Sequence, residues 1–279
     1  MKSLEITTRI GCPVNCKYCP QKTIIKAYTK RSRIRQMTLE TFKTCLDKLP
    51  ARVDIHFTGM CEPWINPQCS QMVLHALTKG HAVGVSTTLQ GMGLKDLELL
   101  KPHAYKFFSI HLPTEKGTES IRVDEQYLAL LSGFVSSGIE ATYHVQGNGP
   151  HPVLGDILEN QEVIVYNPHS RAGNVEILGR HKPSYLRGRI GCSRGLKQNV
   201  LMPSGDVLLC CMDYGMKHVL GNLAQEDLKA LYHNQTFRAV QAGLLDDAMD
   251  ILCRRCEQYA FPVGLKAKLL NKFVPARKN

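Results

Sequence analysis

The chain has 279 residues, of which 43% are hydrophobic and 21% are charged, with 11 cysteines and a formal net charge of +11. This hydrophobic content can form a full core, but no apolar run approaches the roughly 18 residues that a membrane span requires, and the first six residues have a strand pattern and not that of a signal peptide. We therefore expect a cytoplasmic protein, in which many cysteines indicate metal ligation or redox chemistry instead of disulfides.

The positive charge is concentrated in three segments. Residues 1–36 carry nine Lys or Arg against Glu5 alone, residues 257–279 carry five against Glu257 alone, and the acid-free stretch Arg180–Lys197 carries six. Such segments favour an anionic substrate or partner, because they focus a positive potential. Solvated surface faces and disordered basic ends are the alternative.

Strands alternate with helices over the first 166 residues of the sequence. Alternating or short apolar runs predict strands, and apolar residues that recur every three or four positions predict helices. The expected strands cover 4–10, 53–57, 82–87, 106–110, 139–145 and 162–166. The expected helices between them cover 38–49, 67–79, 94–100, 124–137 and, with a weaker pattern, 153–158. This order favours a parallel α/β sheet wound by right-handed βαβ units, with too few strands for a closed eight-stranded barrel.

Beyond residue 166 the alternation stops. Two short strands are expected within 198–210 around the turn at 203–206, followed by helices over 224–232 and 236–243 and a short basic amphipathic helix within 264–278. We therefore predict three parts: a barrel over residues 1–185, a small second domain over 186–258 and a basic C-terminal tail over 259–279.

Three cysteines follow the first expected strand. Cys12, Cys16 and Cys19 form a Cys-x3-Cys-x2-Cys spacing, and Tyr18 precedes the third. A [4Fe-4S] cluster is normally bound by four thiolates, so a loop that supplies three leaves one iron open to another ligand. A structural zinc loop and buried free thiols are the alternatives.

The spacing Cys-x3-Cys-x-aromatic-Cys resembles the signature of the radical S-adenosylmethionine (radical SAM) superfamily. There SAM binds the fourth iron, and an electron from the cluster cleaves SAM to a 5'-deoxyadenosyl radical that abstracts hydrogen from a substrate. The resemblance implies a partial (β/α)6 TIM-like barrel with its active site at the C-terminal strand ends. It also implies an electron donor such as flavodoxin or ferredoxin.

The segment Thr58-Gly59-Met60-Cys61-Glu62-Pro63 follows the second expected strand and resembles the Gly-Gly-Glu-Pro motif of this superfamily. The resemblance implies that backbone carbonyls and the glutamate bind the SAM ammonium group. Here Met60 replaces the second glycine and Cys61 is an additional residue, so the carbonyls that reach SAM remain open. The resulting SAM-binding candidates are Gly59, Met60, Cys61, Glu62 and Pro63.

Other candidates lie at later strand ends. The resemblance implies that Tyr18, Ser86, Thr87 and Ser109 contact SAM, with ordinary polar capping by Ser86, Thr87, Thr88 and Ser109 as the alternative. His111 is a catalytic candidate, because imidazole can accept a proton near neutral pH. Arg171, in the loop Ser170–Asn174, resembles an arginine that lies near SAM or substrate in relatives, and its guanidinium suits a carboxylate or phosphate.

A second set of four cysteines follows the barrel, in the order Cys192, Cys210, Cys253 and Cys256. The layout, with Gly205 between the first two and Cys-x2-Cys at the end, resembles the twitch form of the SPASM domain. That resemblance implies a second, auxiliary [4Fe-4S] cluster, although four thiolates could also bind a structural zinc.

Four cysteines remain outside these motifs. Cys45 and Cys69 lie in expected helices and are interpreted as small core residues. Cys61 and Cys211 are catalytic candidates, because a thiol near a substrate radical can donate a hydrogen atom, as epimerisation requires.

We therefore predict a radical SAM enzyme that dehydrogenates or epimerises a hydroxyl-bearing carbon of an anionic or sugar-derived small molecule, using SAM and two [4Fe-4S] clusters. One alternative is modification of a ribosomally made peptide. Against it, we expect no additional N-terminal peptide-recognition domain, because the cysteine loop already begins at Cys12. Another is a non-enzymatic cysteine-rich basic module that binds nucleic acid or an acidic membrane surface. For the enzyme we expect no nucleic-acid partner and peripheral membrane contact through the basic tail.

Overall fold

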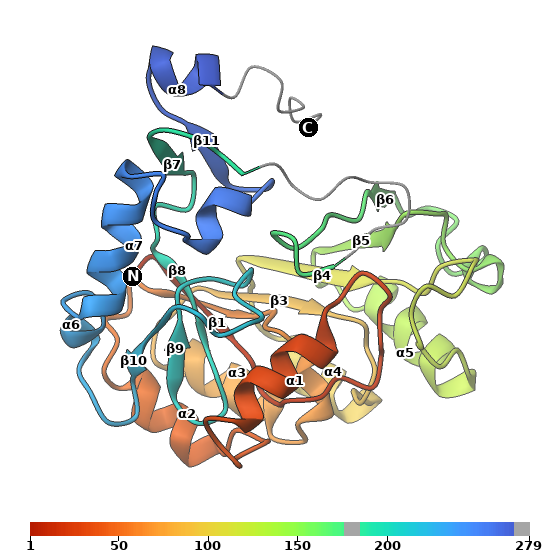
Figure 1. Cartoon of the computed structure of the whole chain (residues 1–279). Coiled ribbons are helices and arrows are strands. Elements are labelled where there is room, and N and C mark those ends of the chain that lie inside the picture. The colour runs from red at the N-terminus through yellow and green to blue at the C-terminus, as the bar shows by residue number, and fades with distance from the viewer. Residues whose placement is uncertain (176–184, 271–279) are drawn as a thin grey trace.

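The computed structural model describes residues 1–175 and 185–270, and its centre is a parallel sheet (Figure 1). Six consecutive strands pair in chain order, each parallel to the next. These strands are β1 Ser3–Ile6, β2 Asp54–Phe57, β3 Val83–Thr87, β4 Phe107–His111, β5 Ala141–Gln146 and β6 Val163–Tyr166. The predicted partial barrel is confirmed.

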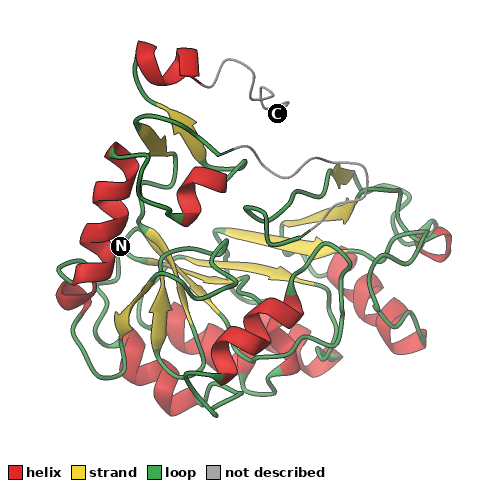
Figure 2. Cartoon of the chain, in the orientation of Figure 1, coloured by secondary structure: helices red, strands yellow, loops and turns green. Residues whose placement is uncertain are grey.

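Helices join consecutive strands from β1 to β5 and cover the outer face of this sheet (Figure 2). They are α1 Gln21–Thr29, α2 Leu39–Leu46, α3 Cys69–Thr78, α4 Leu94–Leu100 and α5 Glu125–Ser136, with a 3-10 turn, η1, at Pro63–Ile65. Polar caps set two of the starts: Thr38 accepts a hydrogen bond from the Thr41 backbone N–H, and Asp124 from that of Tyr127.

The helix α1 was not predicted. This helix starts directly after Pro20, and its buried residues Ile24 and Tyr28 are spaced four positions apart. That apolar spacing is a helical pattern in the sequence. The weak helix expected over 153–158 is wrong: the structure has only the 3-10 turn η2, Pro152–Leu154.

The sheet has an apolar and a polar face. Side chains that point outward from β1 to β5 are buried and apolar, as in Leu4, Ile55 and Val85. On the inner face the register aligns polar residues in rows across the strands: Glu5 pairs with His56, Ser86 with Ser109, and His111 with His144. Barrel interiors are normally filled by branched apolar residues, so this polar face indicates a site.

The C-terminal part of the chain extends the same sheet beyond β1. Strand β8, Gln198–Leu201, lies parallel to β1, and the antiparallel strands β9, Asp206–Leu208, and β10, Val219–Asn222, follow it. The predicted pair of strands within 198–210 is therefore confirmed. The turn between them needs Gly205, because its φ is +88° and an added Cβ would lie 2.7 Å from Asn222 Oδ1.

The rest of the C-terminal part is small and irregular. It contains β7 Ile190–Cys192, α6 Leu228–Leu231, α7 Gln235–Leu245, η3 Leu252–Arg255, β11 Ala260–Pro262 and α8 Leu265–Leu270. Strand β11 pairs with β7, so the first residues of the predicted tail belong to a two-stranded sheet. The predicted helix within 264–278 is seen as α8, and residues 271–279 lie outside the described residues, as do 176–184 between the barrel and β7.

The predicted helix over 224–232 is a single turn, whereas that over 236–243 is slightly longer than expected. None of the helices in the described parts of the chain has the length and apolar character needed to cross a bilayer.

One buried arginine holds the irregular C-terminal segments together. The Arg254 side chain is completely buried, and its guanidinium donates hydrogen bonds to the carbonyl oxygens of Leu186, Gly188 and Gly243, at 2.7, 2.9 and 2.6 Å. It thereby joins the segment before β7, helix α7 and η3. Each of these buried carbonyls would lose its partner without the arginine.

Replacing this side chain tests its structural role. Arg254→Ala should lower the free energy of unfolding by about 3 kcal/mol or more, because three buried acceptors lose their hydrogen bonds. Chemical denaturation followed by circular dichroism measures this change, and Arg238→Ala on the exposed face of α7 should stay within about 0.5 kcal/mol of the wild type. Equal midpoints for the two variants would contradict the assignment.

Candidate active site

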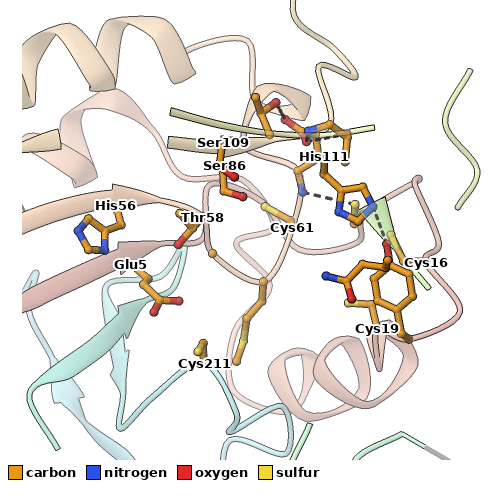
Figure 3. Close-up of a pocket in the computed structure, with 18 of the residues that line it drawn as sticks. Glu5, Cys16, Cys19, His56, Thr58, Cys61, Ser86, Ser109, His111 and Cys211 are labelled. Carbon is orange, nitrogen blue, oxygen red and sulfur yellow. Dashed lines mark hydrogen bonds between the residues drawn. The ribbon is translucent and has the colours of Figure 1, made fainter. Parts of the chain in front are cut away.

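A cavity of about 670 Å³ opens along the polar inner face of the sheet. Figure 3 shows side chains from opposite walls pointing into it, with Glu5 and His56 on one side and Cys16 and Cys19 on the other. The predicted residues that line it are Cys12, Cys16, Tyr18, Cys19, Gly59, Met60, Cys61, Glu62, Ser86, Thr87, Ser109, His111, Arg171 and Cys211. Pro63 does not line it; it is buried and begins η1.

The cysteine loop leaves the C-terminal end of β1, as the sequence predicted. Cys12, Cys16 and Cys19 are each partly exposed to the cavity and none forms a disulfide. Burial raises the pKa of Cys16 to about 12, so a metal would bind there with release of a proton. Three sulfur donors from one loop fit an iron–sulfur cluster that keeps one iron open.

Gln21, which the sequence analysis did not single out, connects the cysteine loop to the segment after β2. Its side-chain amide nitrogen donates to Cys19 Sγ at 3.3 Å and to the Met60 carbonyl oxygen at 2.7 Å. Its amide oxygen accepts from the Cys12 backbone N–H at 3.3 Å. One side chain therefore holds the two motifs in a fixed relative position.

Glu62 lies beside this contact, and hydrogen bonds from Thr87 and Thr88 at the end of β3 fix its carboxylate. One carboxylate oxygen accepts from Thr87 Oγ1 at 2.7 Å, and the other accepts from the Thr88 backbone N–H and Oγ1 at 2.6 and 2.7 Å. Its backbone N–H points to Cys12 Sγ at 3.4 Å. Burial raises the pKa of Glu62 despite these hydrogen bonds, so a cationic group in the cavity would favour its ionised form.

Tyr18 and His111 share a buried carboxylate, Glu119, which sequence reasoning missed. The Tyr18 hydroxyl donates to Glu119 Oε1 at 2.9 Å and lies 2.9 Å from His111 Nε2. Burial alone would raise the pKa of Glu119, but hydrogen bonds from His111, Thr118, Thr114 and Tyr18 lower it to about 2. This network assigns the proton of neutral His111 to Nε2 and leaves Nδ1 as the acceptor nitrogen.

Further polar groups line the wall next to His111. The Ser109 hydroxyl lies 3.0 Å from His144 Nδ1, and the His144 ring meets that of His111 edge-on, with 4.9 Å between centroids. Burial, followed by the effect of His111, lowers the pKa of His144 to about 4. His144 is therefore neutral at physiological pH and can exchange hydrogen bonds with hydroxyl groups.

The loop that carries Arg171 is fastened to the C-terminal part of the chain. Arg171 and Ala172 have φ angles of 51° and 57°, which are uncommon for residues other than glycine. The Ser170 backbone N–H donates to the Glu257 carboxylate, and the Asn174 side chain donates to the Met212 carbonyl at 3.0 Å. These contacts hold the Arg171 side chain at the cavity in spite of the strained backbone.

The second set of cysteines surrounds a separate, small cavity of about 20 Å³. Cys192, Cys210, Cys253 and Cys256 all line it, and most of its remaining wall is apolar, including Leu196, Leu209, Met212 and Leu252. In the described part of the chain no three His, Cys, Asp or Glu side chains converge on one point, as the ligands of a single metal ion do. Four cysteine side chains therefore line one small, mostly apolar cavity.

Arg194 separates the two cavities and lines both of them, together with Gln198 and Tyr259. Its guanidinium bonds to Glu5 Oε1 at 2.9 Å, to Cys211 Sγ at 3.0 Å and to the Tyr259 hydroxyl at 2.7 Å. The wall between the four-cysteine site and the large cavity is therefore one layer of side chains thick.

The remaining cysteines divide as the sequence suggested. Cys45 and Cys69 are fully buried in the main core, whereas Cys61 and Cys211 line the large cavity. The residues that sequence reasoning missed are Glu5, Gln21, Glu119, His144, Arg194, Tyr214 and Tyr259. Of these, Gln21 follows the cysteine motif directly, and Glu5 is a lone charge within an apolar strand, so both had a signal in the sequence.

The sequence comparisons point to one enzyme superfamily. Residues 192–257 match the SPASM family, described as an iron–sulfur cluster-binding domain. Over 268 residues the chain is 22% identical to the S-adenosyl-L-methionine-dependent 2-deoxy-scyllo-inosamine dehydrogenase of Niallia circulans, and the match covers 91% of both chains.

The structure comparisons agree in fold. The crystal structure of BtrN in complex with AdoMet and 2-DOIA has a TM-score of 0.58 at 17% identity, covering 92% of this chain and 93% of that one. Native anSMEcpe with bound AdoMet has a TM-score of 0.59 at 12% identity, over 91% and 86% of the chains. Streptococcus suis SuiB bound to the precursor peptide SuiA has 0.63 at 14% identity, over 86% of this chain and 66% of that one.

The motif after β1, the partial barrel, the C-terminal iron–sulfur domain and the SAM-dependent relative therefore agree. Residues 192–257 match an iron–sulfur cluster-binding SPASM domain, and the chain as a whole is similar to S-adenosyl-L-methionine-dependent enzymes of the oxidoreductase type.

Proposed function

We propose that this enzyme dehydrogenates a hydroxyl-bearing carbon of a small, sugar-derived substrate bound in the 670 Å³ cavity. The observation that carries the proposal is the polar inner face of the barrel. Beyond the residues assigned to SAM below, Thr58, Thr142 and His144 present hydroxyl and imidazole groups to the cavity. Such groups exchange hydrogen bonds with a polyol, whereas an apolar substrate would leave them unpaired. The 2-deoxy-scyllo-inosamine dehydrogenase activity of the relative supports the same chemical class.

The cofactors are assigned to residues that fit them. Cys12, Cys16 and Cys19 would hold one [4Fe-4S] cluster, and Cys192, Cys210, Cys253 and Cys256 a second. The segment from Gly59 to Glu62, with Tyr18, Ser86, Thr87, Ser109 and Arg171 around it, would hold SAM. When bound, the first cluster in its reduced state would supply with SAM a 5'-deoxyadenosyl radical, and the second cluster in its oxidised state would supply an acceptor for one electron.

Oxidation of a secondary alcohol to a ketone removes a hydrogen atom from carbon, a proton from oxygen and one electron. We assign this proton to His111, because its Nε2 contacts Tyr18 and Glu119, which leaves Nδ1 as the acceptor, and the Glu119 carboxylate would stabilise the resulting charge. The thin wall of Arg194 and Tyr259 puts the four-cysteine site next to the cavity that holds the substrate. The proton and the electron that the oxidation releases would therefore each have a nearby acceptor.

Epimerisation is the second candidate, and the position of Cys211 favours it. This thiol lines the cavity and is held by Arg194, so it could return a hydrogen atom to the substrate radical from a different side. Cys61 lines the cavity as well, where Thr8 Oγ1 lies 3.5 Å from its sulfur. Peptide modification is less well supported, because the peptide-bound SuiB structure is 14% identical to this chain, whereas the dehydrogenase relative is 22% identical over 91% of both chains. The same relative favours an enzyme over the non-enzymatic basic module.

The cluster count tests the cofactor assignment. Anaerobic reconstitution should give about eight irons per chain and, with SAM and a reductant, 5'-deoxyadenosine. The variant Cys253→Ala/Cys256→Ala should fall to about four irons, and Cys45→Ala should keep the wild-type content. About four irons with one bound zinc in the wild type would overturn the second cluster.

The SAM-binding role of Glu62 is tested by Glu62→Gln. The amide keeps the size of the side chain and removes its charge, so the Kd for SAM of the reconstituted enzyme should rise about tenfold through loss of a charge-assisted hydrogen bond. Isothermal titration under anaerobic conditions measures it, with the exposed Glu140→Gln as the matched control. A wild-type Kd in Glu62→Gln would remove this residue from the SAM site.

Product analysis distinguishes oxidation from epimerisation. With 2-deoxy-scyllo-inosamine and related cyclitols as probes, dehydrogenation gives a product two mass units lighter and consumes one SAM per turnover. His111→Asn should lower the yield of ketone per 5'-deoxyadenosine about a hundredfold, because the proton acceptor is lost. If the product instead has the substrate mass and gains one deuterium from D2O, and Cys211→Ser abolishes that gain, the reaction is an epimerisation.

A further inference from the structure

One face of α1 carries a row of exposed lysines. Lys22, Lys26 and Lys30 are exposed at intervals of four residues, so they lie on the same side of the helix. We call these three residues the α1 lysine face. None of them forms an ion pair within 4 Å of a carboxylate in the described parts of the chain, and the sequence holds no Asp or Glu between Glu5 and Glu40.

This face borders a hollow in the surface. A depression of about 700 Å³ is lined by the α1 lysine face, Arg31 and the neighbouring Gly215 and Met216. Arg31 is the one cation of this group with a partner within the described residues, at 3.7 Å from Asp206. Figure 1 shows α1 on the outside of the fold, where a second macromolecule can reach it.

The α1 lysine face lies next to the cysteine loop. Helix α1 begins two residues after Cys19, and Gln21 in its first turn contacts Cys19 Sγ at 3.3 Å. The nine residues of α1 span roughly 13 Å at the usual helical rise. A molecule bound along these lysines would therefore lie on the solvent-exposed side of α1, at a distance from the cysteine loop no greater than about the length of this helix.

We infer that the α1 lysine face is the docking surface for an acidic one-electron carrier protein of the flavodoxin or ferredoxin type. The inference rests on the proposed function, because the carrier gives up one electron to the iron–sulfur site assigned to Cys12, Cys16 and Cys19, which gains it. Unpaired cations attract an acidic protein from a distance and raise its association rate. The surface next to the loop is also where such a carrier must sit.

A nucleic acid or an anionic membrane would meet the same charges, but neither accounts for their position. Those polyanions bind wherever phosphates meet enough cations, whereas the α1 lysine face is confined to the helix that leaves the cysteine loop. We therefore treat DNA and anionic lipid as competing outcomes of the test.

The experiment compares two triple variants of the reconstituted enzyme. K22Q/K26Q/K30Q removes the α1 lysine face, and K2Q/K95Q/K229Q removes three exposed lysines elsewhere; lysine and glutamine have similar helix propensity. Binding to a bacterial flavodoxin is measured by biolayer interferometry at 25 and 250 mM NaCl. The rate of 5'-deoxyadenosine formation is measured with reduced flavodoxin and, separately, with dithionite.

We expect K22Q/K26Q/K30Q to bind flavodoxin at least tenfold more weakly at low salt and to lose flavodoxin-driven turnover to the same extent, with dithionite-driven turnover unchanged. The control variant should match the wild type, and high salt should reduce the difference. Equal weakening in both variants, or none in either, would overturn the inference. So would binding of a 20-base-pair DNA duplex or phosphatidylglycerol vesicles through these lysines while flavodoxin-driven turnover stays normal.

Failure of the proposed function has a different signature. In that case no 5'-deoxyadenosine forms with either reductant, whereas the binding measurement still reports on the α1 lysine face.

Discussion

The structure depends on the pairing of β1 along both of its edges. Because β2 and β8 both run parallel to it, the barrel and the C-terminal strands form one continuous sheet. The C-terminal end of β1 leads into the cysteine loop, while Lys197, just before β8, accepts hydrogen bonds from the first residues of the chain. Glu5 lies between these ends and accepts a hydrogen bond from Arg194, so a single short strand connects the cysteine loop with the wall of the four-cysteine site.

This arrangement explains why charge is tolerated inside the barrel. A lone carboxylate on a buried strand is costly, and Glu5 is compensated by Arg194, which in turn lies 3.9 Å from the centre of the Tyr259 ring. At the other end Glu119 is compensated by hydrogen bonds from four polar side chains. Both carboxyl groups are therefore fixed in position by their hydrogen bonds.

The sequence predicted the parts of this structure that are local. The strands, the cysteine spacings and the hairpin around Gly205 all follow from residues that are close in the chain, and so could be recognised without coordinates. Glu119 and Arg194 could not, because Glu119 lies in an irregular loop and meets Tyr18 only through the fold, and Arg194 joins Glu5 across 189 positions. Helix α1 is a local element that was nevertheless not predicted. The spacing of its buried Ile24 and Tyr28 is a helical pattern, but the same segment is rich in Lys and Arg and was interpreted by its charge alone.

The departure from the Gly-Gly-Glu-Pro pattern has a structural reason in α1. The Met60 side chain is buried in a small core with Ile24 and Tyr28 of that helix, and its carbonyl oxygen accepts from Gln21. A glycine at this position would leave space in that core and a less constrained loop. The packed Met60 side chain therefore fixes the segment after β2 against α1, and the Gln21 hydrogen bonds connect both to the cysteine loop.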